Sequence, residues 1–307
     1  MKILVTGGAG FIGSNIVDAL IEAGHDVCVV DNLYMGRLQN LNPNAKFYLM
    51  DLRADELEKV FALEKFDVVY HEAAQMDVRR SVENPVFDAE VNVLGTLNIL
   101  QNAVKAGVQK IIFASTGGAI YGEQDYFPAD ENHPNRPVSP YGITKLTVEK
   151  YLFFYELTYN LQSVILRYAN VYGPRQNPHG EAGVVAIFIE KMLKDQQPVI
   201  NGDGTQTRDF VFVGDVVRAN LLALDYPKSD IFNVGTGIET DVNIVFRELN
   251  KIVRKNTPEK HGLAKDGEQQ RSVIDYKKIK KTLGWEPVVS LQDGLRQTVE
   301  YFQRFEV

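Results

Sequence analysis

A glycine-rich turn near the start of the chain constrains the fold more than any other feature. Lys2–Thr6 is short, apolar and rich in β-branched residues, which predicts a buried strand. It leads directly into Gly7-Gly8-Ala9-Gly10-Phe11-Ile12-Gly13, and a helical pattern of apolar residues covers Phe11–Ala23. The glycines permit a tight turn, a close approach of the backbone to a ligand, and close packing of helix on strand. This unit predicts an α/β fold in which the helix N-terminus faces an anion such as a pyrophosphate.

The first half of the chain repeats this alternation of strand and helix. Further strands are expected at Val27–Val30, Phe47–Met50, Val68–Tyr70 and Ile111–Ser115, each apolar enough to be covered on both faces. A long helix is expected between the last two, from about Val86 to Ala106. Strands and helices in this order predict a doubly wound parallel sheet, the Rossmann class.

After a proline-rich loop the pattern changes. A second long helix is expected from about Tyr141 to Asn160, then a strand at Val164–Tyr168, and late helices at Lys280–Gly284 and Leu291–Phe305. We therefore expect a Rossmann domain over residues 1–168, completed by a segment at about 211–235. The remainder of 169–307 is expected to form a smaller, mixed α/β substrate-binding lobe.

Composition excludes several other classes of protein. Lys and Arg number 33 against 40 Asp and Glu, a net charge of −7, so neither nucleic acid nor an anionic membrane is an expected partner. No apolar run approaches the ~20 residues that span a bilayer, and the start of the chain does not resemble a signal peptide, so we expect a cytoplasmic protein. The one cysteine, Cys28, excludes disulfides and cysteine-based zinc sites, and its valine neighbours predict a buried thiol. The histidines suggest no metal site.

A carboxylate at the end of the second strand indicates which dinucleotide is bound. Asp31 follows Val27–Val30, eighteen residues after Gly13. At that place a carboxylate can accept hydrogen bonds from both hydroxyl groups of the adenosine ribose. Because it would repel a 2′-phosphate, the sequence predicts NAD and not NADP.

Tyr141 and Lys145 form a second chemical signal. Residues four apart share one helical face, and a nearby ammonium group favours the phenolate form of tyrosine. Lowering the phenol pKa from ~10 by about 3 units requires about 4 kcal/mol, which the lysine and a cationic nicotinamide together can supply. Tyr-x-x-x-Lys alone is common, but after a dinucleotide turn and a strand ending in Ala114-Ser115-Thr116 it indicates an active site.

Further sequence motifs lie along the whole chain. They are TGGAGFIGS at 6–14, HEAAQ at 71–75, STGGAIYGE at 115–123, SPYGITK at 139–145, RYANVYGPRQ at 167–176, NGDGTQTRDFVFVGDV at 201–216, FNVGTG at 232–237 and LGWEP at 283–287. With them the chain resembles the extended short-chain dehydrogenase/reductase family, and within it the UDP-glucose 4-epimerase branch.

The resemblance implies where NAD is held. Phe11 and Ile12 would donate backbone amides to its pyrophosphate, Asp31 and Asn32 would hold the adenosine ribose, and Asn92 would give support from the long helix. The full set expected for the cofactor is Gly7, Gly10, Phe11, Ile12, Gly13, Asp31, Asn32, Asp51, Leu52, Ala73, Ala74, Gln75, Asn92, Tyr141, Lys145 and Tyr168.

The resemblance also implies a catalytic set of Thr116, Tyr141 and Lys145, in which the Thr116 hydroxyl bonds the sugar O4. The nucleotide-sugar site would comprise Thr116, Asn170, Val184, Val185, Arg208, Lys265, Glu268, Arg271 and Ser272. Counted from Gly267-Glu268, Ser272 falls where relatives have a residue that limits the size of the sugar. A serine there would admit an N-acetyl group at C2; the alternative is a surface or turn residue with no view of the sugar.

Three positions depart from the family pattern. Glu72 stands where an apolar residue is usual, which would fit a side chain directed to solvent. Lys265 replaces an arginine, so that a bidentate phosphate contact becomes a point charge. The loop from Thr116 to Ala119 looks one residue longer than in many relatives, which leaves the position of the Thr116 hydroxyl open.

The predicted function is an NAD-dependent 4-epimerase of galactose metabolism, an isomerase that interconverts UDP-glucose and UDP-galactose through a 4-keto sugar and a returned hydride. A 4-epimerase of UDP-N-acetylglucosamine or UDP-glucuronate is the alternative. Gly117-Gly118 after Thr116 disfavours dehydratases and decarboxylases, which carry an acid there. A catalytically inactive NAD sensor is disfavoured because Tyr141 and Lys145 are both retained.

The two long helices, at about 86–106 and 141–160, carry many apolar residues. In relatives they pair into a four-helix bundle, which implies a homodimer here. A plain core role for these apolar residues is the alternative.

Overall fold

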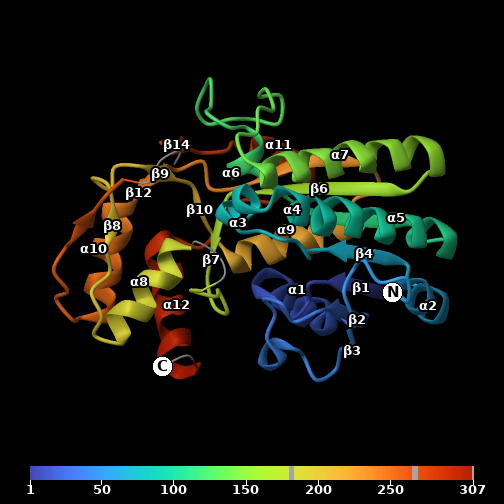
Figure 1. Ribbon diagram of the computed structural model, residues 1–307, viewed down its shortest axis with the longest axis horizontal. Coiled ribbons are helices and arrows are strands. Elements are labelled where there is room, and N and C mark those ends of the chain that lie inside the picture. The colour runs from blue at the N-terminus through green and yellow to red at the C-terminus, as the bar shows by residue number, and fades with distance from the viewer. Residues whose placement is uncertain (180–182, 265–268, 306–307) are drawn as a thin grey trace.

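A parallel seven-stranded sheet forms the larger part of the molecule (Figure 1). The computed structural model describes residues 1–179, 183–264 and 269–305. The sheet order is β11-β6-β5-β4-β1-β2-β3, and every neighbouring pair is parallel. The strands are β1 Lys2–Thr6, β2 Asp26–Asp31, β3 Lys46–Leu49, β4 Val68–His71, β5 Lys110–Thr116, β6 Gln162–Tyr168 and β11 Asp230–Val234. The predicted Rossmann class is confirmed.

Helices cover both faces of this sheet. Apolar residues of α1 (Phe11–Glu22) and α9 (Val213–Asp225) pack on one face, around Val5 and Val29. Those of α2 (Leu57–Glu64), α5 (Gly95–Ala106) and α7 (Pro140–Tyr159) pack on the other. The order of the strands reverses between β1 and β4, so the crevice at their carboxyl ends is where such a sheet binds ligands.

A smaller body lies at the left of Figure 1, beyond β7 (Asn170–Tyr172) and β10 (Phe210–Phe212). Its core is made by α8, α10 and α12 with those two strands. Their bounds are Val184–Leu193, Val242–Val253 and Leu291–Phe305, and the short strands are β8 Ile200–Asn201, β9 Thr207–Arg208, β12 Thr240–Asp241, β13 His261–Gly262 and β14 Arg271–Ser272. The remaining short helices are η1 Leu38–Asn40, α3 Val78–Glu83, α6 Gly117–Ile120 and α11 Lys277–Leu283.

The prediction of a single helix at about 86–106 is wrong, because this segment has three consecutive helical parts. It consists of α4 (Pro85–Ala89), a π-helical turn η2 (Glu90–Leu94) and α5. Within the π turn, the carbonyl of Asn92 accepts a hydrogen bond from Thr96 Oγ1 at 2.6 Å. The wider turn directs the Asn92 side chain at the loop after β4, and π turns often occur at functional sites.

Further expectations concern Cys28, membrane-spanning helices and metal sites. Cys28 is fully buried, which confirms the prediction of a buried thiol, and burial raises its pKa to about 11. Within the described part of the chain, no helix is long and apolar enough to cross a membrane, and no cluster of His, Cys, Asp and Glu could hold a metal ion.

Candidate active site

The glycine turn lies between β1 and α1 and is packed against the end of β4. Gly7 has φ of +70°, and a Cβ there would lie 2.7 Å from the backbone nitrogen of Ala73. A Cβ on Gly13 would lie 2.3 Å from the Gly7 carbonyl oxygen. Glycine is therefore required at both positions. No side chain caps α1 at Gly10. The first backbone amides of the helix, those of Phe11 and Ile12, are therefore placed to bind a pyrophosphate.

Asp31, at the end of β2, is buried against this turn. Its carboxylate accepts hydrogen bonds from the backbone amides of Ala9 (3.0 Å) and Leu33 (2.8 Å). Burial raises its pKa, while these two amides oppose that shift. Each oxygen keeps a further lone pair, so the fixed carboxylate fits the two hydroxyl groups of a ribose.

Asn32, expected at the adenosine ribose, forms a second cluster with Asp51 and Leu52, which the predicted cofactor set also includes. Asn32 Nδ2 donates to Asp51 Oδ2 at 3.0 Å. The guanidinium of Arg53 also binds Asp51, and this hydrogen bonding holds the pKa of the carboxyl well below its usual range. Leu52 is buried, and its carbonyl accepts a hydrogen bond from Asn98 at 2.7 Å. Asn32, Asp51 and Leu52 therefore lie along one edge of the crevice.

The loop after β4 is held by reciprocal hydrogen bonds with the π turn. The Gln75 amide donates to Asn92 Oδ1 at 2.7 Å, and Asn92 Nδ2 donates to the Gln75 carbonyl at 2.8 Å. Asp88 Oδ2 accepts from Thr144 Oγ1 at 2.8 Å, which ties the same network to α7. Asn92 thus fixes the backbone of Gln75, while the amide of Ala73, beside the glycine turn, donates to Thr6 Oγ1 at 3.3 Å.

The two ends of the Tyr-x-x-x-Lys motif lie together on α7. Lys145 is buried, its Nζ donates to the carbonyl of Ala114 at 2.8 Å, and it lies 5.9 Å from the centre of the Tyr141 ring. Burial lowers the pKa of Lys145 to about 8, although nearby carboxylates led by Glu72 oppose the shift. Tyr141 is half-buried at the start of the helix, whose first turn is capped by Ser139.

Polar side chains from three segments meet over Gly118. A Cβ on Gly118 would lie 3.8 Å from both Asn170 Oδ1 and Thr116 Oγ1, and 4.0 Å from Ser272 Oγ. Thr116 ends β5 and caps the short helix α6, which stands where a loop was expected: its hydroxyl accepts a hydrogen bond from the amide of Ala119 at 3.2 Å, and this fixes its position. Ser272 is buried, so the alternative of a surface residue is wrong, while its contact with a sugar stays a prediction.

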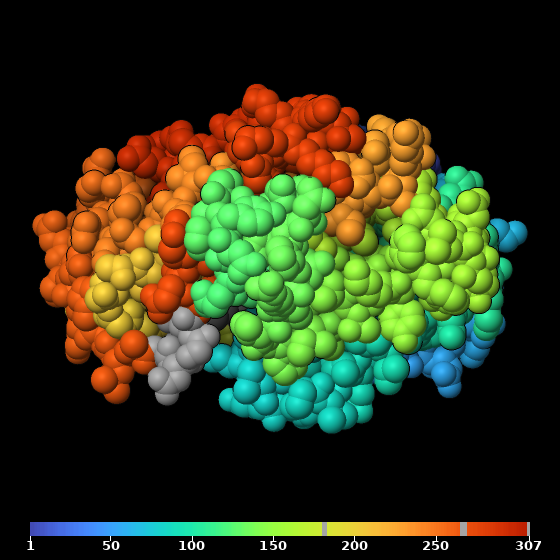
Figure 2. All heavy atoms as spheres, turned by 90° about the horizontal axis from the view of Figure 1, so that it is seen from above, coloured from blue at the N-terminus to red at the C-terminus, as the bar shows by residue number. Residues whose placement is uncertain are grey.

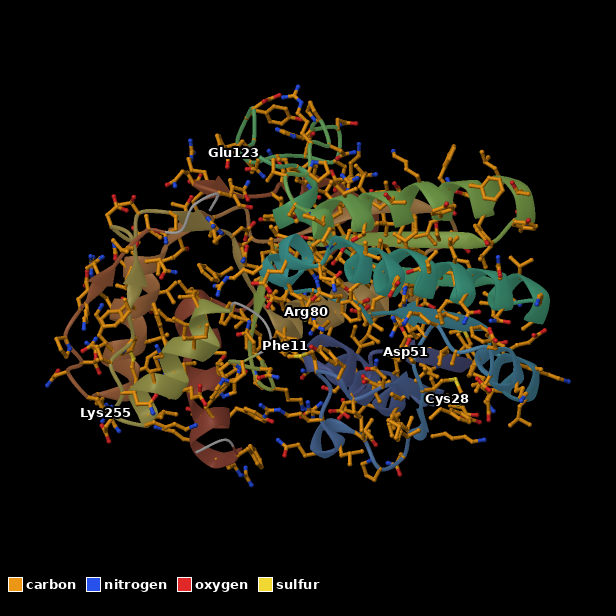
Figure 3. All side chains as sticks on the ribbon, in the orientation of Figure 1. Phe11, Cys28, Asp51, Arg80, Glu123 and Lys255 are labelled. Atoms are coloured by element: carbon orange, nitrogen blue, oxygen red, sulfur yellow. The ribbon has the colours of Figure 1, made fainter. Side chains whose placement is uncertain are left out.

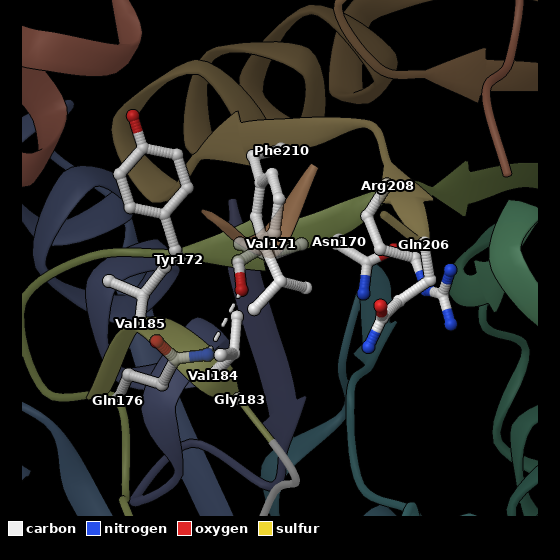
Figure 4. A pocket seen from close by; sticks show the side chains of 11 residues that line it. Asn170, Val171, Tyr172, Gln176, Gly183, Val184, Val185, Gln206, Arg208 and Phe210 are labelled. Atoms are coloured by element: carbon white, nitrogen blue, oxygen red, sulfur yellow. Dashed lines mark hydrogen bonds between the residues drawn. The ribbon is translucent and has the colours of Figure 1, made fainter. Parts of the chain in front are cut away.

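A pocket between β7, β10 and α8 continues from this group (Figure 4). Asn170, Gln206 and Arg208 lie together at one end of it, and Val184 and Val185 lie at the other. The Arg208 Nη1 donates to the carbonyl of Thr207 at 2.8 Å. Amide and guanidinium donors beside an apolar wall suit a nucleoside diphosphate.

Arg271, another predicted substrate residue, is not among the residues that line this pocket. Arg271 is exposed, forms an ion pair with Glu239 at 2.6 Å and stacks 3.6 Å from the centre of the Phe127 ring. Lys265 and Glu268 lie outside the described residues. The contacts proposed for all three with uridine diphosphate stay predictions.

Two groups in the site were not foreseen. Glu72 does not point to solvent: Tyr168 donates a hydrogen bond to its Oε1 at 3.4 Å, and its Oε2 is buried. Arg167 and Glu149 form a fully buried ion pair at 2.6 Å that links β6 to α7. Glu149 also accepts a hydrogen bond from Ser115 at 2.6 Å, beside Thr116. An arginine within an otherwise apolar strand was the one signal in the sequence for this pair.

The fold and the site together define an enzyme that uses a bound dinucleotide. A sequence model of the NAD-dependent epimerase/dehydratase family matches residues 3–235. The chain therefore belongs to this family, which confirms the predictions of the family and of NAD as cofactor.

Individual relatives show which members of the family the chain resembles. A putative UDP-glucose 4-epimerase of Methanocaldococcus jannaschii is 50% identical over 301 residues, 98% of either chain. The structure of a UDP-glucose 4-epimerase of Thermotoga maritima with UDP-glucose has a TM-score of 0.97 and 51% identity, and covers 99% of each chain. That of a Thermus thermophilus UDP-glucose 4-epimerase complex with NAD has a TM-score of 0.94 and 44% identity, over 99% of this chain and 100% of the other.

Proposed function

We propose that the protein is an NAD-dependent UDP-glucose 4-epimerase that interconverts UDP-glucose and UDP-galactose. The observation that supports the proposal is that Lys145 lies beside Tyr141 and binds the carbonyl of Ala114, two residues before Thr116 in β5. Thr116 and Asn170 both lie next to Gly118, and Asn170 also lines the pocket of Figure 4. The similarity to proteins named UDP-glucose 4-epimerase supports the choice of reaction.

Each of the three catalytic residues has a distinct task. When bound, NAD supplies an acceptor for the hydrogen at C4 of the sugar and later returns that hydrogen. Tyr141 takes the proton of the 4-hydroxyl as the sugar is oxidised, and gives it back to the keto oxygen as the sugar is reduced. The ammonium of Lys145, held by the Ala114 carbonyl, favours the phenolate of Tyr141. The Thr116 hydroxyl orients the 4-oxygen of the sugar towards Tyr141.

A direct assay tests this function. Purified protein is mixed with UDP-galactose without added NAD, and the formation of UDP-glucose is followed by chromatography. We expect conversion by the wild type, and a loss of several orders of magnitude in Tyr141→Phe, which removes only the phenolic oxygen. A matched control, Tyr151→Phe further along α7, should retain the rate. Protein that holds NAD but does not convert UDP-galactose would contradict the proposal.

A second substrate is supported by the position of Ser272. Its small side chain is buried next to Gly118, where the hydroxyl of Thr116 and the amide of Asn170 also meet. This arrangement favours UDP-N-acetylglucosamine, whose acetamide group needs room that a large aromatic residue would fill. Among the residues that the structure describes, no comparable feature favours UDP-glucuronate.

We also propose a homodimer formed through α7 and the helices beside it, α3 and α4. These helices pack against each other and expose large apolar side chains. The exposed residues are Val78, Val82, Val86, Ile143, Phe153, Phe154, Leu157 and Tyr159, and Leu94 of the adjoining π turn is exposed too. α7 and the loop before it, green to yellow-green, form much of the face in Figure 2. Light scattering should show twice the chain mass of 34.5 kDa, whereas a monomer at micromolar concentration would contradict this interface.

A further inference from the structure

The loop that joins α6 to α7 is bound to the segment that follows β14. This loop comprises residues 122–138, and the label of Glu123 marks it near the top of Figure 3. Its backbone is fixed at one place: the amide of Ala129 donates to the Val273 carbonyl at 3.0 Å, and the amide of Asp275 donates to the Ala129 carbonyl at 2.8 Å. The loop therefore has a firm anchor at Ala129.

Two residues before this anchor, a side chain of β14 holds the loop. The Cζ of Arg271 lies 3.6 Å from the centre of the Phe127 ring. The edge of the same guanidinium donates two hydrogen bonds to Glu239, from Nε to Oε2 at 3.1 Å and from Nη2 to Oε1 at 2.6 Å. Glu239 in turn accepts a hydrogen bond from Thr207 Oγ1 of β9 at 2.9 Å. We call Phe127, Arg271 and Glu239 the latch.

The latch uses two properties of an arginine side chain at once. A planar guanidinium can stack its face on an aromatic ring while its edge donates to a carboxylate in bidentate form. Bidentate geometry is a case in which a partly exposed ion pair does contribute to stability, and the contact with the ring adds further attraction. A lysine in place of Arg271 would keep the charge but could not make both contacts in this way.

Arg271 and its neighbour Ser272 face opposite ways. Ser272 is buried, and its Oγ lies 4.0 Å from the place of a Cβ on Gly118, beside Thr116. Because side chains alternate along a strand, Arg271 points away from this group, and half of its side chain is exposed. Arg271 is therefore placed to fix the wall of the proposed sugar site and not to line it.

The latch joins two sides of that site. On one side, the loop of residues 122–138 continues into the first turn of α7, which carries Tyr141. On the other, β14 pairs with β9 so that Ser272 lies opposite Arg208 of the nucleotide pocket. An enzyme that takes a hydrogen from C4 and returns it to the same sugar has to keep the keto sugar bound in between. If the two sides moved apart, the keto sugar could leave.

We propose that Arg271 is a positioning residue that keeps the sugar site closed while the 4-keto sugar is present. Oxidation of the sugar passes the C4 hydrogen with two electrons to the cofactor and the proton of the 4-hydroxyl to Tyr141. If the UDP-linked ketone leaves at this stage, the cofactor stays reduced and that molecule stops turning over. The latch holds the loop of residues 122–138 against β14, and so favours return of the hydrogen over escape of the ketone. The inference rests on the proposed epimerase reaction.

The test measures how much reduced cofactor is left on the protein per molecule of product. Wild type, Arg271→Lys and Phe127→Ala, each with its bound cofactor, convert UDP-galactose, and the near-ultraviolet absorbance of the reduced ring is compared with the UDP-glucose formed. We expect this ratio to rise about tenfold in each variant, which corresponds to about 1.4 kcal/mol, and no further in the double variant. Arg136→Lys is the matched control, because Arg136 pairs with Asp125 within the same loop at 3.1 Å. It should match the wild type.

A second measurement needs no turnover. In the cofactor-loaded protein, the backbone amides of residues 122–128 should exchange with deuterated water about tenfold faster in Arg271→Lys than in the wild type. Unchanged exchange, or an unchanged ratio of reduced cofactor to product in either variant, would overturn the inference. An affinity for UDP that falls in Arg271→Lys but not in Phe127→Ala would also overturn it, since Arg271 would then bind the diphosphate itself. Wild type that does not convert UDP-galactose would overturn the proposed function, and the exchange measurement would still decide whether the latch holds the loop.

Discussion

Replacement of Lys145 by methionine tests how the active site produces a base at neutral pH. The Lys145 Nζ lies 5.9 Å from the centre of the Tyr141 ring. With an effective dielectric constant of about 20, a unit charge at that distance stabilises a phenolate by about 3 kcal/mol, or about two pKa units. Without it, the pKa of Tyr141 should rise by about two units. If the rate follows the phenolate fraction, turnover at pH 7 should fall about 100-fold.

The assay is the pH–rate profile for UDP-galactose at saturating substrate. In Lys145→Met the acidic limb should move about two units to higher pH, so that the rate recovers about tenfold for each unit above pH 7. Lys150→Met removes an exposed charge from the same helix and should leave the profile unchanged. Bound NAD is measured in each sample, because loss of cofactor would lower the rate without moving the limb. A limb at the wild-type pH in cofactor-loaded Lys145→Met would refute the electrostatic argument.

Three further predictions follow from other parts of the site. Denatured protein should release NAD and not NADP, identified by mass, because the Asp31 carboxylate fixed by Ala9 and Leu33 would repel a 2′-phosphate; mainly NADP would show that Asp31 does not hold the ribose. Ser272→Tyr should abolish turnover of UDP-N-acetylglucosamine and spare UDP-galactose, and equal loss of both activities would contradict the size limit. Arg167→Met should lower the free energy of unfolding by about 3–5 kcal/mol, since it leaves Glu149 charged and buried; denaturant titration measures this, and adding Glu149→Gln should restore much of the loss.

Lys145 also has a consequence for stability that depends on pH. Its pKa in the folded protein, about 8, lies below the usual value of 10.5. The unfolded state therefore binds the proton more strongly. Below pH 8, burial of this ammonium lowers the free energy of unfolding by its full amount. The deficit should diminish as the pH rises from about 8 to about 10.5. Comparing the urea unfolding of wild type and Lys145→Met at the two ends of this range measures it, and a difference that does not depend on pH would contradict the argument.

Much of the fold was predictable because its signals are local. The strand Lys2–Thr6, the glycine turn and the Tyr141–Lys145 pair each lie within one short segment, and each has the predicted structure. The π turn at Glu90–Leu94 was missed because one extra residue in a helix hardly alters an apolar pattern read over 21 residues. Its function, to bring Asn92 to Gln75, depends on a loop seventeen residues away in the sequence.

The unforeseen side chains depend on contacts between distant segments. Glu72 follows an apolar strand, and neither its identity nor its spacing tells whether it turns to solvent or to Tyr168, which is 96 residues further on. Arg167 is fully buried because Glu149 of α7 receives it, and this pairing exists only once β6 and α7 are packed together. For such residues the sequence supplies the chemistry, while the topology of the sheet decides the partner.

In the proposed mechanism, the hydrogen at C4 leaves the sugar and returns to the same molecule. UDP-galactose carrying deuterium at C4 tests this claim most directly, with the UDP-glucose formed in ordinary water analysed by mass spectrometry and NMR. We expect the product to keep its deuterium at C4, without exchange with solvent, and Tyr141→Phe to form almost no product. Product in which deuterium at C4 has been replaced by hydrogen from water would contradict it.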